Sequence, residues 1–293
     1  MTSTASLRSS WPGGIVPASL NFNIEQPNQD RIGIIGLGYV GMAIKLTVDF
    51  GWGNIVCIDP NNGHTGTYEE IADCSGVFVC VPTPQDDNGI CDASILTDVL
   101  SKLDSIHYKG VIISKCTATP DIYERLNTQY PNLVHCPEFL TSANSSQDYE
   151  NATWTIIGGA VRAWRNEAER IVKLTQPNLK TVKFCKIGEA ALAKYAVNSF
   201  LAIKVTFMNE LYQMANKAGL NYDIVANLVK QDERIGPTHM TVPGPDGVLG
   251  FGGKCFPKDT GTLLQYAEGL GINLMVLDAA VKKNLLLRLT DLK

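Results

Sequence analysis

The stretch Ile32-Gly33-Ile34-Ile35-Gly36-Leu37-Gly38-Tyr39-Val40-Gly41 decides the fold of this 293-residue chain. Four apolar residues, typical of a buried strand, run directly into a Gly-x-Gly-x-x-Gly turn and a helix-compatible segment. In a dinucleotide site Gly36 allows the tight turn, Gly38 lets the pyrophosphate approach the backbone, and Gly41 permits close helix packing. Asp59 ends the next apolar run about twenty residues later, which is the context that makes this motif specific. The alternative is a glycine-rich turn that binds nothing.

The cofactor that this pattern favours is NAD. The helix begins near Tyr39 and Val40, and its N-terminal partial positive charge faces the phosphates. Asp59 would accept hydrogen bonds from the adenosine ribose hydroxyls and would repel a 2′-phosphate, which disfavours NADP. A second loop, Val81-Pro82-Thr83-Pro84, follows a strand end, and Thr83 offers a hydroxyl to a ribose. Without the neighbouring glycine motif, an ordinary Pro-rich turn would be the better interpretation.

Strand-like and helix-like segments alternate up to about residue 187, which indicates a parallel sheet with crossover helices. Thereafter strand signals almost vanish, and long helix candidates begin with residues 189–218. We therefore predict an α/β fold with an N-terminal Rossmann-like doubly wound parallel sheet, followed by an all-helical central domain. The predicted division is a flexible arm at 1–30, an NAD-binding domain at 31–187 and a helical domain at 188–293. The expected strands are Ile32–Ile35, Ile55–Ile58, Val77–Val81, Val111–Ser114, Leu133–Cys136, Trp154–Ile157 and Thr181–Cys185, and the later expected helices span 221–230, 259–268 and 274–289.

Composition narrows the class of protein. Apolar residues make up 45% and charged residues 18%, which is typical of a folded chain with a core. The net charge of −4 argues against a nucleic-acid or anionic-membrane surface. The first thirty residues lack a signal-peptide pattern, so a cytoplasmic location is expected. The eight cysteines include no C-x-x-C pair, so neither a metal site nor a disulfide framework is expected.

Gly250-Phe251-Gly252-Gly253-Lys254-Cys255-Phe256-Pro257-Lys258-Asp259 is the segment richest in chemistry. Pro257 suits the first position of a helix, which would place Cys255 just before that helix. A thiol at a helix start with Lys254 and Lys258 nearby should have its thiolate favoured. The glycines leave room for a substrate, and Asp259 lies within reach of a group bound to sulfur. The alternative is a buried cysteine near a helix cap.

Three further sites carry polar groups that suit the same chemistry. Lys194 and Asn198 lie four residues apart on one face of the long helix, where a cation and an amide could hold a hydroxyl and stabilise an oxyanion. Glu138 and Thr117 each follow a predicted strand, at the edge of the sheet where ligands bind. Taken alone, Lys194 and Asn198 could equally be a solvated lysine and an incidental amide, whereas Glu138 and Thr117 are better interpreted as surface side chains.

In order and context, GLGYVG, VPTP, KCT, PEFL, the Lys-x-x-x-Asn helix, DERIG and GFGGKCFPKD resemble the UDP-glucose 6-dehydrogenase family, which includes the GDP-mannose and UDP-mannosamine-type enzymes. The resemblance covers residues 31–293. It implies that a nucleotide-sugar alcohol, most simply UDP-glucose, is oxidised to the acid in two NAD-dependent steps. Cys255 would capture the aldehyde as a thiohemiacetal and later carry a thioester. A homodimer is implied, because in this family the arginine that matches Arg234 commonly reaches the substrate from the neighbouring subunit.

The resemblance also implies a set of site residues. They are, for catalysis, Cys255, Lys194, Asn198, Asp259, Glu138 and Thr117; for the cofactor, Gly36, Gly38, Tyr39, Val40, Gly41, Asp59, Val81, Pro82, Thr83, Thr117 and Lys258; and for the substrate, Glu138, Phe139, Leu140, Lys194, Asn198, Arg234, Phe251 and Gly252. No metal belongs to the set.

The chain departs from the family pattern in several places. Family members are usually about a hundred residues longer and carry a third domain that grips the nucleotide, so we expect this chain to lack that domain. Ser142, Cys136 and Trp154 stand where Glu, Asn and Arg are usual. Two other functions therefore stay open. One is an NAD-binding dimeric relic without strong catalysis. The other is a single-step β-hydroxyacid dehydrogenase, which pairs the same domain types but needs no nucleophilic cysteine, so Cys255 argues against it.

Overall fold

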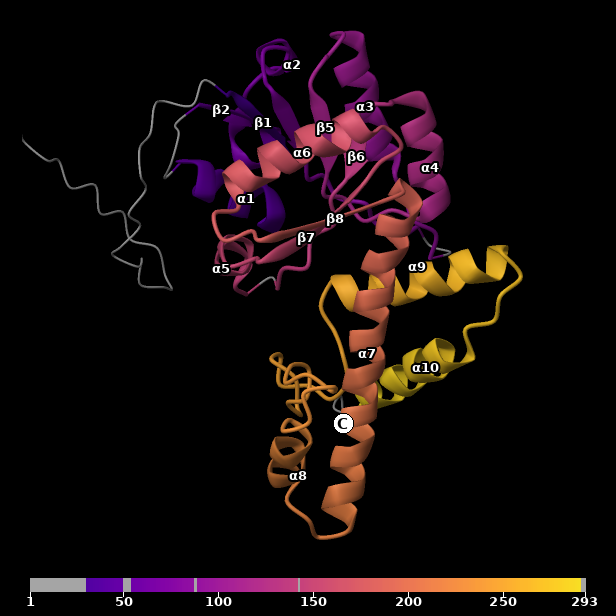
Figure 1. Ribbon diagram of the computed structural model, residues 1–293. Helices are drawn as coiled ribbons and strands as arrows, with labels where there is room; N and C mark the ends of the chain where they lie inside the picture. The colour runs from indigo at the N-terminus through magenta and orange to yellow at the C-terminus, as the bar shows by residue number, and fades with distance from the viewer. Residues whose placement is uncertain (1–29, 50–53, 87–88, 142, 291–293) are drawn as a thin grey trace, which may run out of the picture.

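The structure is a computed structural model that describes residues 30–49, 54–86, 89–141 and 143–290. The arm predicted at residues 1–30 lies, apart from residue 30, outside the described residues. The described chain forms one large sheet flanked by helices, from which a long helix, α7 (Ile187–Lys217), extends away (Figure 1). No helix of the described ranges is long and apolar enough to cross a membrane.

Eight strands form a single sheet in the order β3-β2-β1-β4-β5-β6-β7-β8. The central five strands, from β2 to β6, are parallel. The chain order reverses between β1 and β4, which is the point where open α/β sheets bind ligands. The strands are β1 (Ile32–Ile35), β2 (Ile55–Asp59), β3 (His64–Thr65), β4 (Gly76–Val79), β5 (Val111–Ser114), β6 (Leu133–His135), β7 (Trp154–Gly158) and β8 (Thr181–Cys185).

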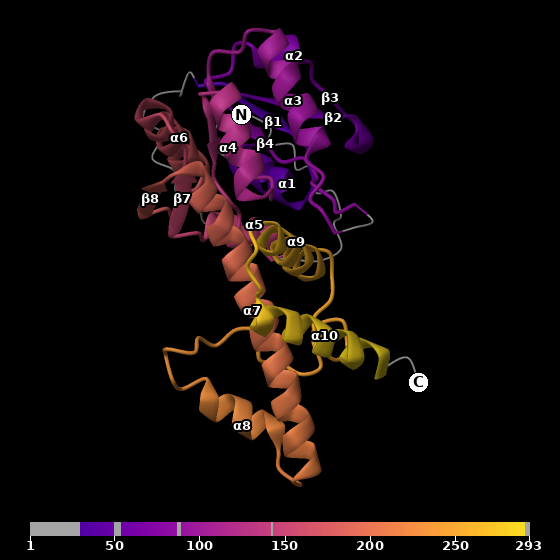
Figure 2. The ribbon, with the colours of Figure 1, turned by 90° about the vertical axis from the view of Figure 1, so that its right-hand side faces the viewer.

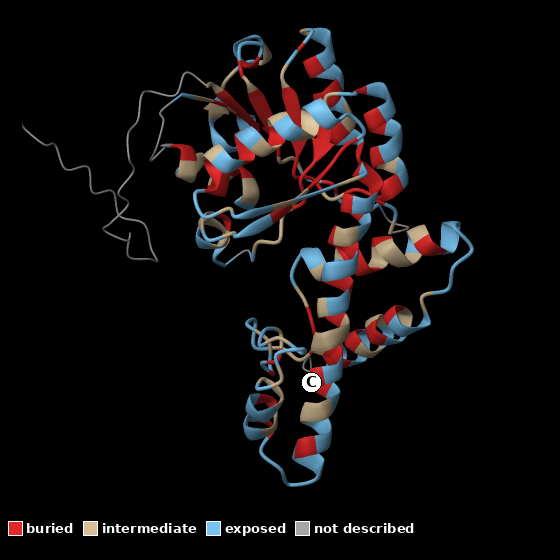
Figure 3. Cartoon of the chain, in the orientation of Figure 1, coloured by how far each residue is buried: buried red, intermediate tan, exposed pale blue. Residues whose placement is uncertain are grey.

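Helices cover both faces of the sheet because alternate strand residues are apolar on both sides. One apolar cluster joins the strands to α1 (Tyr39–Asp49), α5 (Ser145–Glu150) and α6 (Arg162–Thr175). The other joins them to α2 (Tyr68–Ile71), α3 (Ser94–Ser105), α4 (Pro120–Gln129) and the start of α7. Figure 3 shows the central strands buried between these two layers. The predicted doubly wound α/β architecture is therefore confirmed.

The sheet is not wholly parallel, which corrects one part of the prediction. β3 pairs antiparallel with β2, and β7 pairs antiparallel with β6. A parallel return needs a crossover of a dozen or more residues over the sheet. The link from β2 to β3 holds only the short helix η1 (Pro60–Asn62), too little for a crossover. The link from β6 to β7 is longer, but its described part carries the six-residue α5, which packs on α1 instead of forming a crossover. Both strands therefore run back beside their predecessors.

Beyond β8 every described element is a helix: α7 (Ile187–Lys217), α8 (Tyr222–Val229), α9 (Cys255–Gly269) and α10 (Met275–Thr290). With 31 residues, α7 extends over about 46 Å at 1.5 Å per residue. Its first turns contact α4, β6 and β7, and its later turns contact α8, α9 and α10. Figure 2 shows α9 lying directly below the sheet, so α7 and α9 together bring helical residues to the sheet edge.

The start of α9 corrects a second prediction. The helix begins at Cys255 itself, not two residues later, and Pro257 is its third residue. A proline is tolerated there because none of the first four backbone N–H groups of a helix has an intrahelical acceptor. The thiol therefore belongs to the first helical residue.

Candidate active site

The carboxyl ends of four parallel strands bring most of the predicted site residues to one edge of the sheet. The glycine turn follows β1, Asp59 ends β2, Thr83 follows β4 and Thr117 follows β5. α7 and α9 approach the same edge (Figure 2), and Lys194 belongs to α7 while Cys255 is the first residue of α9. The site is therefore formed where the sheet meets the helical segment.

The glycine turn has the geometry that a dinucleotide needs. Gly36 has a φ of 89°, and a Cβ atom there would lie 2.8 Å from the carbonyl oxygen of Cys80. A Cβ atom on Gly41 would overlap the carbonyl oxygen of Gly36, so helix α1 packs against the turn only without a side chain. A Cβ atom on Gly38 would meet nothing within 4 Å. The space beside Gly38, next to the exposed Tyr39 and half-buried Val40, thus fits the pyrophosphate of NAD.

Asp59 is oriented by the turn that it faces. Its carboxylate accepts hydrogen bonds from the backbone N–H of Leu37 at 2.7 Å and the side-chain amide of Asn62 at 2.8 Å. Burial raises the pKa of Asp59, but these hydrogen bonds and one from Asn61 outweigh it, and the pKa lies below its usual range. The group is therefore an anionic acceptor for ribose hydroxyls, which fits NAD.

The loop after β4 is joined to the loop after β5. The Thr83 hydroxyl is buried and donates to the carbonyl oxygen of Thr117 at 2.5 Å. Its proton is therefore directed at the protein, and a ribose hydroxyl could only donate to it. Val81 and Pro82 are half-buried and exposed, respectively, beside this contact.

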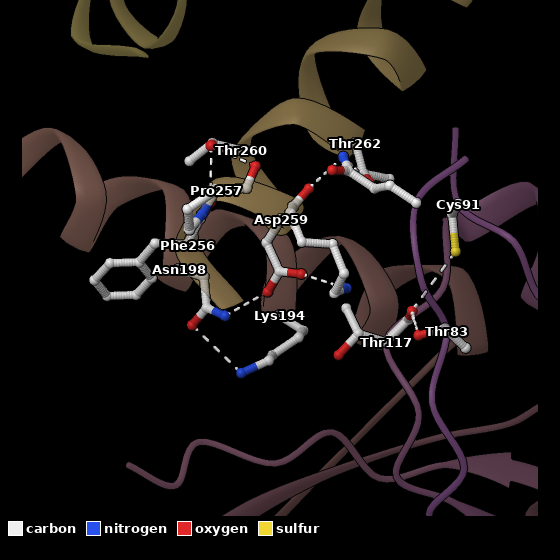
Figure 4. Close-up of polar contacts among 12 residues, drawn as sticks. Thr83, Cys91, Thr117, Lys194, Asn198, Phe256, Pro257, Asp259, Thr260 and Thr262 are labelled. Carbon is white, nitrogen blue, oxygen red and sulfur yellow. Dashed lines mark hydrogen bonds and ion pairs between the residues drawn. The ribbon is translucent and has the colours of Figure 1, made fainter. Parts of the chain in front are cut away.

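A chain of hydrogen bonds runs across α7 and α9 (Figure 4). The Lys194 ammonium donates to the Asn198 carbonyl oxygen at 3.3 Å, and the Asn198 amide donates to Asp259 at 2.5 Å. The other Asp259 oxygen accepts from the Lys258 ammonium at 2.7 Å. Lys194, Asn198 and Asp259 are all buried. Four of the predicted residues thus form one continuous polar network.

Burial gives Lys194 an unusual acidity. Burial lowers the pKa of its ammonium, and the nearby Asp259, Cys255 and Glu138 oppose this shift without cancelling it. The same charges show that Lys194 lies within electrostatic range of all three groups. Its ammonium also lies 5.2 Å from the centre of the Phe139 ring. A lysine with a lowered pKa is suited to accept a proton.

Cys255 is exposed at the first residue of α9. No side chain among the described residues caps this N-terminus, so the N–H groups of the first turn are not satisfied by a capping side chain. The positive end of a helix stabilises an oxyanion formed beside it. Lys258, which the sequence predicts as a neighbour of the Cys255 thiol, forms an ion pair with Asp259. The N-terminus of α9 is therefore the clearer source of positive potential at Cys255.

Glu138 is held by a residue that the sequence did not single out for a role. The Lys115 ammonium lies 3.0 Å from the Glu138 carboxylate and 3.3 Å from the Cys136 sulfur. Lys115 has no exposed side-chain surface and Glu138 has 11%. Burial lowers the pKa of Lys115, but its neighbours, among them the Glu138 carboxylate, outweigh burial and raise this pKa well above its usual value. The signal in the sequence that could have identified Lys115 is its position directly after the apolar strand β5.

The glycine loop before Cys255 is fixed by amides from two helices. Asn284 of α10 accepts from the Phe251 N–H at 2.6 Å and donates to the Phe251 carbonyl at 3.0 Å. Asn209 of α7 accepts from the Gly250 N–H at 2.9 Å. At Gly252 a Cβ atom would overlap Arg288. Sequence reasoning found Phe251 and Gly252 but missed these anchors, which lie far away in the chain.

Arg234 lies apart from this network. It follows α8, pairs with Asp232, and 87% of its side chain is exposed. Leu140, by contrast, is half-buried beside Phe139, whose ring lies 5.1 Å from that of Trp154. Most of the predicted residues therefore come together within one chain, and Arg234 does not.

Two sequence models of one family match the chain, and together they cover more than half of it. The NAD binding domain of the UDP-glucose/GDP-mannose dehydrogenase family matches residues 62–176, and the central domain of the same family matches residues 188–285. A UDP-glucose 6-dehydrogenase of Bacillus subtilis is 27% identical over 87% of this chain and 66% of its own length. One from Haloferax volcanii is 30% identical over 75% of this chain and 54% of its own length.

Solved structures share the fold. A UDP-glucose dehydrogenase from Pyrobaculum islandicum aligns with a TM-score of 0.74 and 24% identity, over 92% of this chain and 70% of that one. A 3-hydroxyisobutyrate dehydrogenase from Mycobacterium tuberculosis aligns with a TM-score of 0.69 and 17% identity, over 86% and 91%. The chain spans about two thirds of the length of the first curated relatives.

Proposed function

Because this chain belongs to the UDP-glucose/GDP-mannose dehydrogenase family, we propose that it is an NAD-dependent nucleotide-sugar dehydrogenase that oxidises UDP-glucose to UDP-glucuronate through Cys255. The observation that carries this proposal is the buried Lys194–Asn198–Asp259 network within electrostatic range of an exposed helix-start cysteine. A single oxidation of an alcohol needs no such cysteine. A two-step oxidation does, because the aldehyde must be retained between the steps.

In the first step the C6 hydroxyl of the sugar loses its proton and C6 becomes an aldehyde carbon. NAD, when bound beside the glycine turn, supplies the two-electron acceptor for each oxidation. Lys194 is the proton acceptor that its lowered pKa favours, with a water on Asp259 as the competing acceptor. Asn198 is hydrogen-bonded to both Lys194 and Asp259 and fixes their positions. The sugar hydroxyl therefore meets its proton acceptor at a fixed place.

In the second step the Cys255 thiolate adds to the aldehyde carbon, and the oxygen takes up a proton to give a thiohemiacetal. Its oxidation leaves a thioester on Cys255. Water then attacks the thioester carbon, the acid forms, and the thiolate leaves. Lys194 and the α9 N-terminus are placed to stabilise the oxyanion of this hydrolysis. Glu138, Thr117 and Asp259 are the groups that we assign to the attacking water.

The same proposal assigns the remaining groups to two domains. Residues 31–187 bind NAD through Gly36, Gly38, Asp59 and the loop at 81–83, and residues 188–293 carry the thiol and bind the sugar with Phe251 and Gly252. Exposed apolar side chains follow α7 and α10, which supports a homodimer through the helical domain: Phe200, Phe207, Met214, Leu285, Leu286 and Leu289. Arg234 then reaches the substrate of the partner.

The Cys255→Ala variant tests the covalent step. We expect it to bind NAD with unchanged affinity, to form the aldehyde in a single turnover, and to form no acid. Purified protein should be incubated with UDP-glucose, GDP-mannose or UDP-N-acetylmannosamine, and the products identified by mass spectrometry. Acid formation by Cys255→Ala at the rate of the unaltered protein would exclude the thioester. Acid from another nucleotide sugar alone would replace UDP-glucose as the substrate.

A further inference from the structure

A half-buried glutamine in the loop after β4 joins the cofactor edge of the sheet to the helix that carries Cys255. The side-chain amide of Gln85 donates to the Lys258 carbonyl oxygen at 2.7 Å and to the Thr262 hydroxyl at 2.9 Å. It also lies 3.1 Å from the Gly89 carbonyl oxygen of its own loop. One amide thus connects two segments that are more than 170 residues apart.

The acceptors of Gln85 lie on the face of α9 that also carries the reacting groups. Lys258 and Thr262 are three and seven residues after Cys255, so all three share one side of the helix. Thr262 is buried. Fixing these two positions therefore fixes the direction in which the first turn of α9 points its thiol.

Gly261 leaves the room that Gln85 occupies. A Cβ atom on Gly261 would lie 2.9 Å from the Gln85 nitrogen, closer than real Cβ contacts come. Gly261 lies inside helix α9, where glycine is less favourable than alanine. No positive φ requires it, so the close approach of Gln85 is the reason that the structure offers for glycine at this position.

The loop that carries Gln85 is itself anchored to the site. Gln85 and Cys91 form an antiparallel bridge, and the Cys91 thiol lies 3.7 Å from the Thr117 carbonyl oxygen. The same carbonyl accepts the hydrogen bond from Thr83. The Gln85 loop and the Thr83 loop are therefore held at the same carbonyl, beside the predicted site residue Thr117.

We propose that Gln85 is a positioning residue that, with Gly261, aligns the Cys255 helix with the NAD-binding edge for the second oxidation. This inference deepens the proposed function and rests on it. The second oxidation demands the alignment more than the first, because its substrate is bonded to the α9 thiol. A misaligned helix lets the aldehyde escape before it is oxidised.

Two variants remove the contact in different ways. Gln85→Ala removes the whole amide, and Gln85→Glu keeps its shape but replaces the donor by a carboxylate that can only accept. Both variants should lower the NADH formed per UDP-glucose from two toward one, and the free aldehyde should be trapped by a carbonyl reagent. Their NAD affinity should stay within about twofold of the unaltered protein, because the residues assigned to NAD are unchanged. The matched control Gln129→Ala, an exposed glutamine on α4, should behave as the unaltered chain.

The Gly261→Ala substitution supplies the second arm as a double-mutant cycle. Alone it should impair the second oxidation, because its methyl group displaces Gln85; combined with Gln85→Ala it should add nothing. Additive effects of the two substitutions would overturn the pairing. A slower reaction that keeps two NADH per sugar in Gln85→Ala would show a merely structural role and would also overturn the proposal.

A readout without turnover separates this inference from the proposed function. The rate of Cys255 alkylation by iodoacetamide, followed by peptide mass spectrometry, should change by about threefold or more in Gln85→Ala, since thiol reactivity depends on its position at the helix end. If the unaltered protein oxidises no nucleotide sugar, the proposed function fails, and this rate alone decides the Gln85 assignment. An unchanged rate would then reject it.

Discussion

At the scale of single residues, burial determines which of the charged groups can do chemistry. Lys194 and Lys115 are both buried, but they differ in the charges around them. Lys115 contacts Glu138 directly, and its pKa is raised well above the usual value, so it stays a cation that holds a carboxylate. Lys194 meets an amide oxygen at 3.3 Å, and burial lowers its pKa. Of the two, Lys194 is the one that can exchange a proton.

The pH dependence of the first hydride transfer should reveal Lys194. Neutral lysine is the base, so the rate should rise with pH to a plateau, with a midpoint below the ordinary lysine value of 10.5. The measurement is single-turnover NADH formation by Cys255→Ala, in which the thiol cannot contribute. Lys194→Arg stays charged and should be slow throughout. A profile of Lys194→Ala that still rises with the same midpoint would assign the proton to another group.

The buried ion pair makes a stability prediction. Lys115→Met leaves the Glu138 carboxylate without its cation in a largely buried place, which should lower the free energy of unfolding by about 3 kcal/mol. Urea denaturation measures this loss. The control Lys102→Met breaks an exposed pair with Asp98 and should cost under about 1 kcal/mol. Equal losses in the two variants would mean that burial does not govern the Lys115 pair.

At the scale of elements, the loop before Cys255 depends on α10. Asn284→Ala removes both hydrogen bonds to Phe251 and leaves the buried Phe251 N–H without its acceptor, whereas the Phe251 carbonyl keeps its hydrogen bond from Arg288. We expect a loss of about 2 kcal/mol in the free energy of unfolding, together with weaker sugar binding and unchanged NAD affinity. Calorimetric titration and denaturation measure the two effects. The exposed Asn227→Ala on α8 is the matched control, and an equal effect there would contradict the anchoring role.

The elements differ in how far the sequence predicts them. The run at Ile32–Gly41 specifies β1, the turn and α1 because strand, glycine spacing and helix follow one another locally. The direction of β7 was not predictable in this way, since it depends on α5 packing against α1 rather than on any local signal. Lys194, Asn198 and Asp259 were predictable from motifs, but Gln85, Asn209 and Asn284 act across long sequence separations. Such contacts have no pattern in one sequence.

At the scale of the whole molecule, the position of Arg234 predicts shared active sites. Its side chain is 87% exposed and contacts Asp232 rather than the Lys194 network. If Arg234 acts on the partner's substrate, the homodimers of Arg234→Ala and of Cys255→Ala should each form no acid. After the two are mixed and allowed to exchange subunits, about a quarter of the normal site activity should return, from random pairing into two-fold dimers. No recovery, despite mixed dimers seen by native mass spectrometry, would place Arg234 in its own subunit's site.

The central claim is that Cys255 carries a sugar aldehyde through a second oxidation, and stoichiometry tests it most directly. Purified protein is given excess NAD and a limiting, known amount of UDP-glucose, and NADH is counted by absorbance at completion. Two NADH and one UDP-glucuronate are expected for each UDP-glucose consumed. One NADH for each sugar, with aldehyde as the final product, would contradict it and would leave a single-step dehydrogenase.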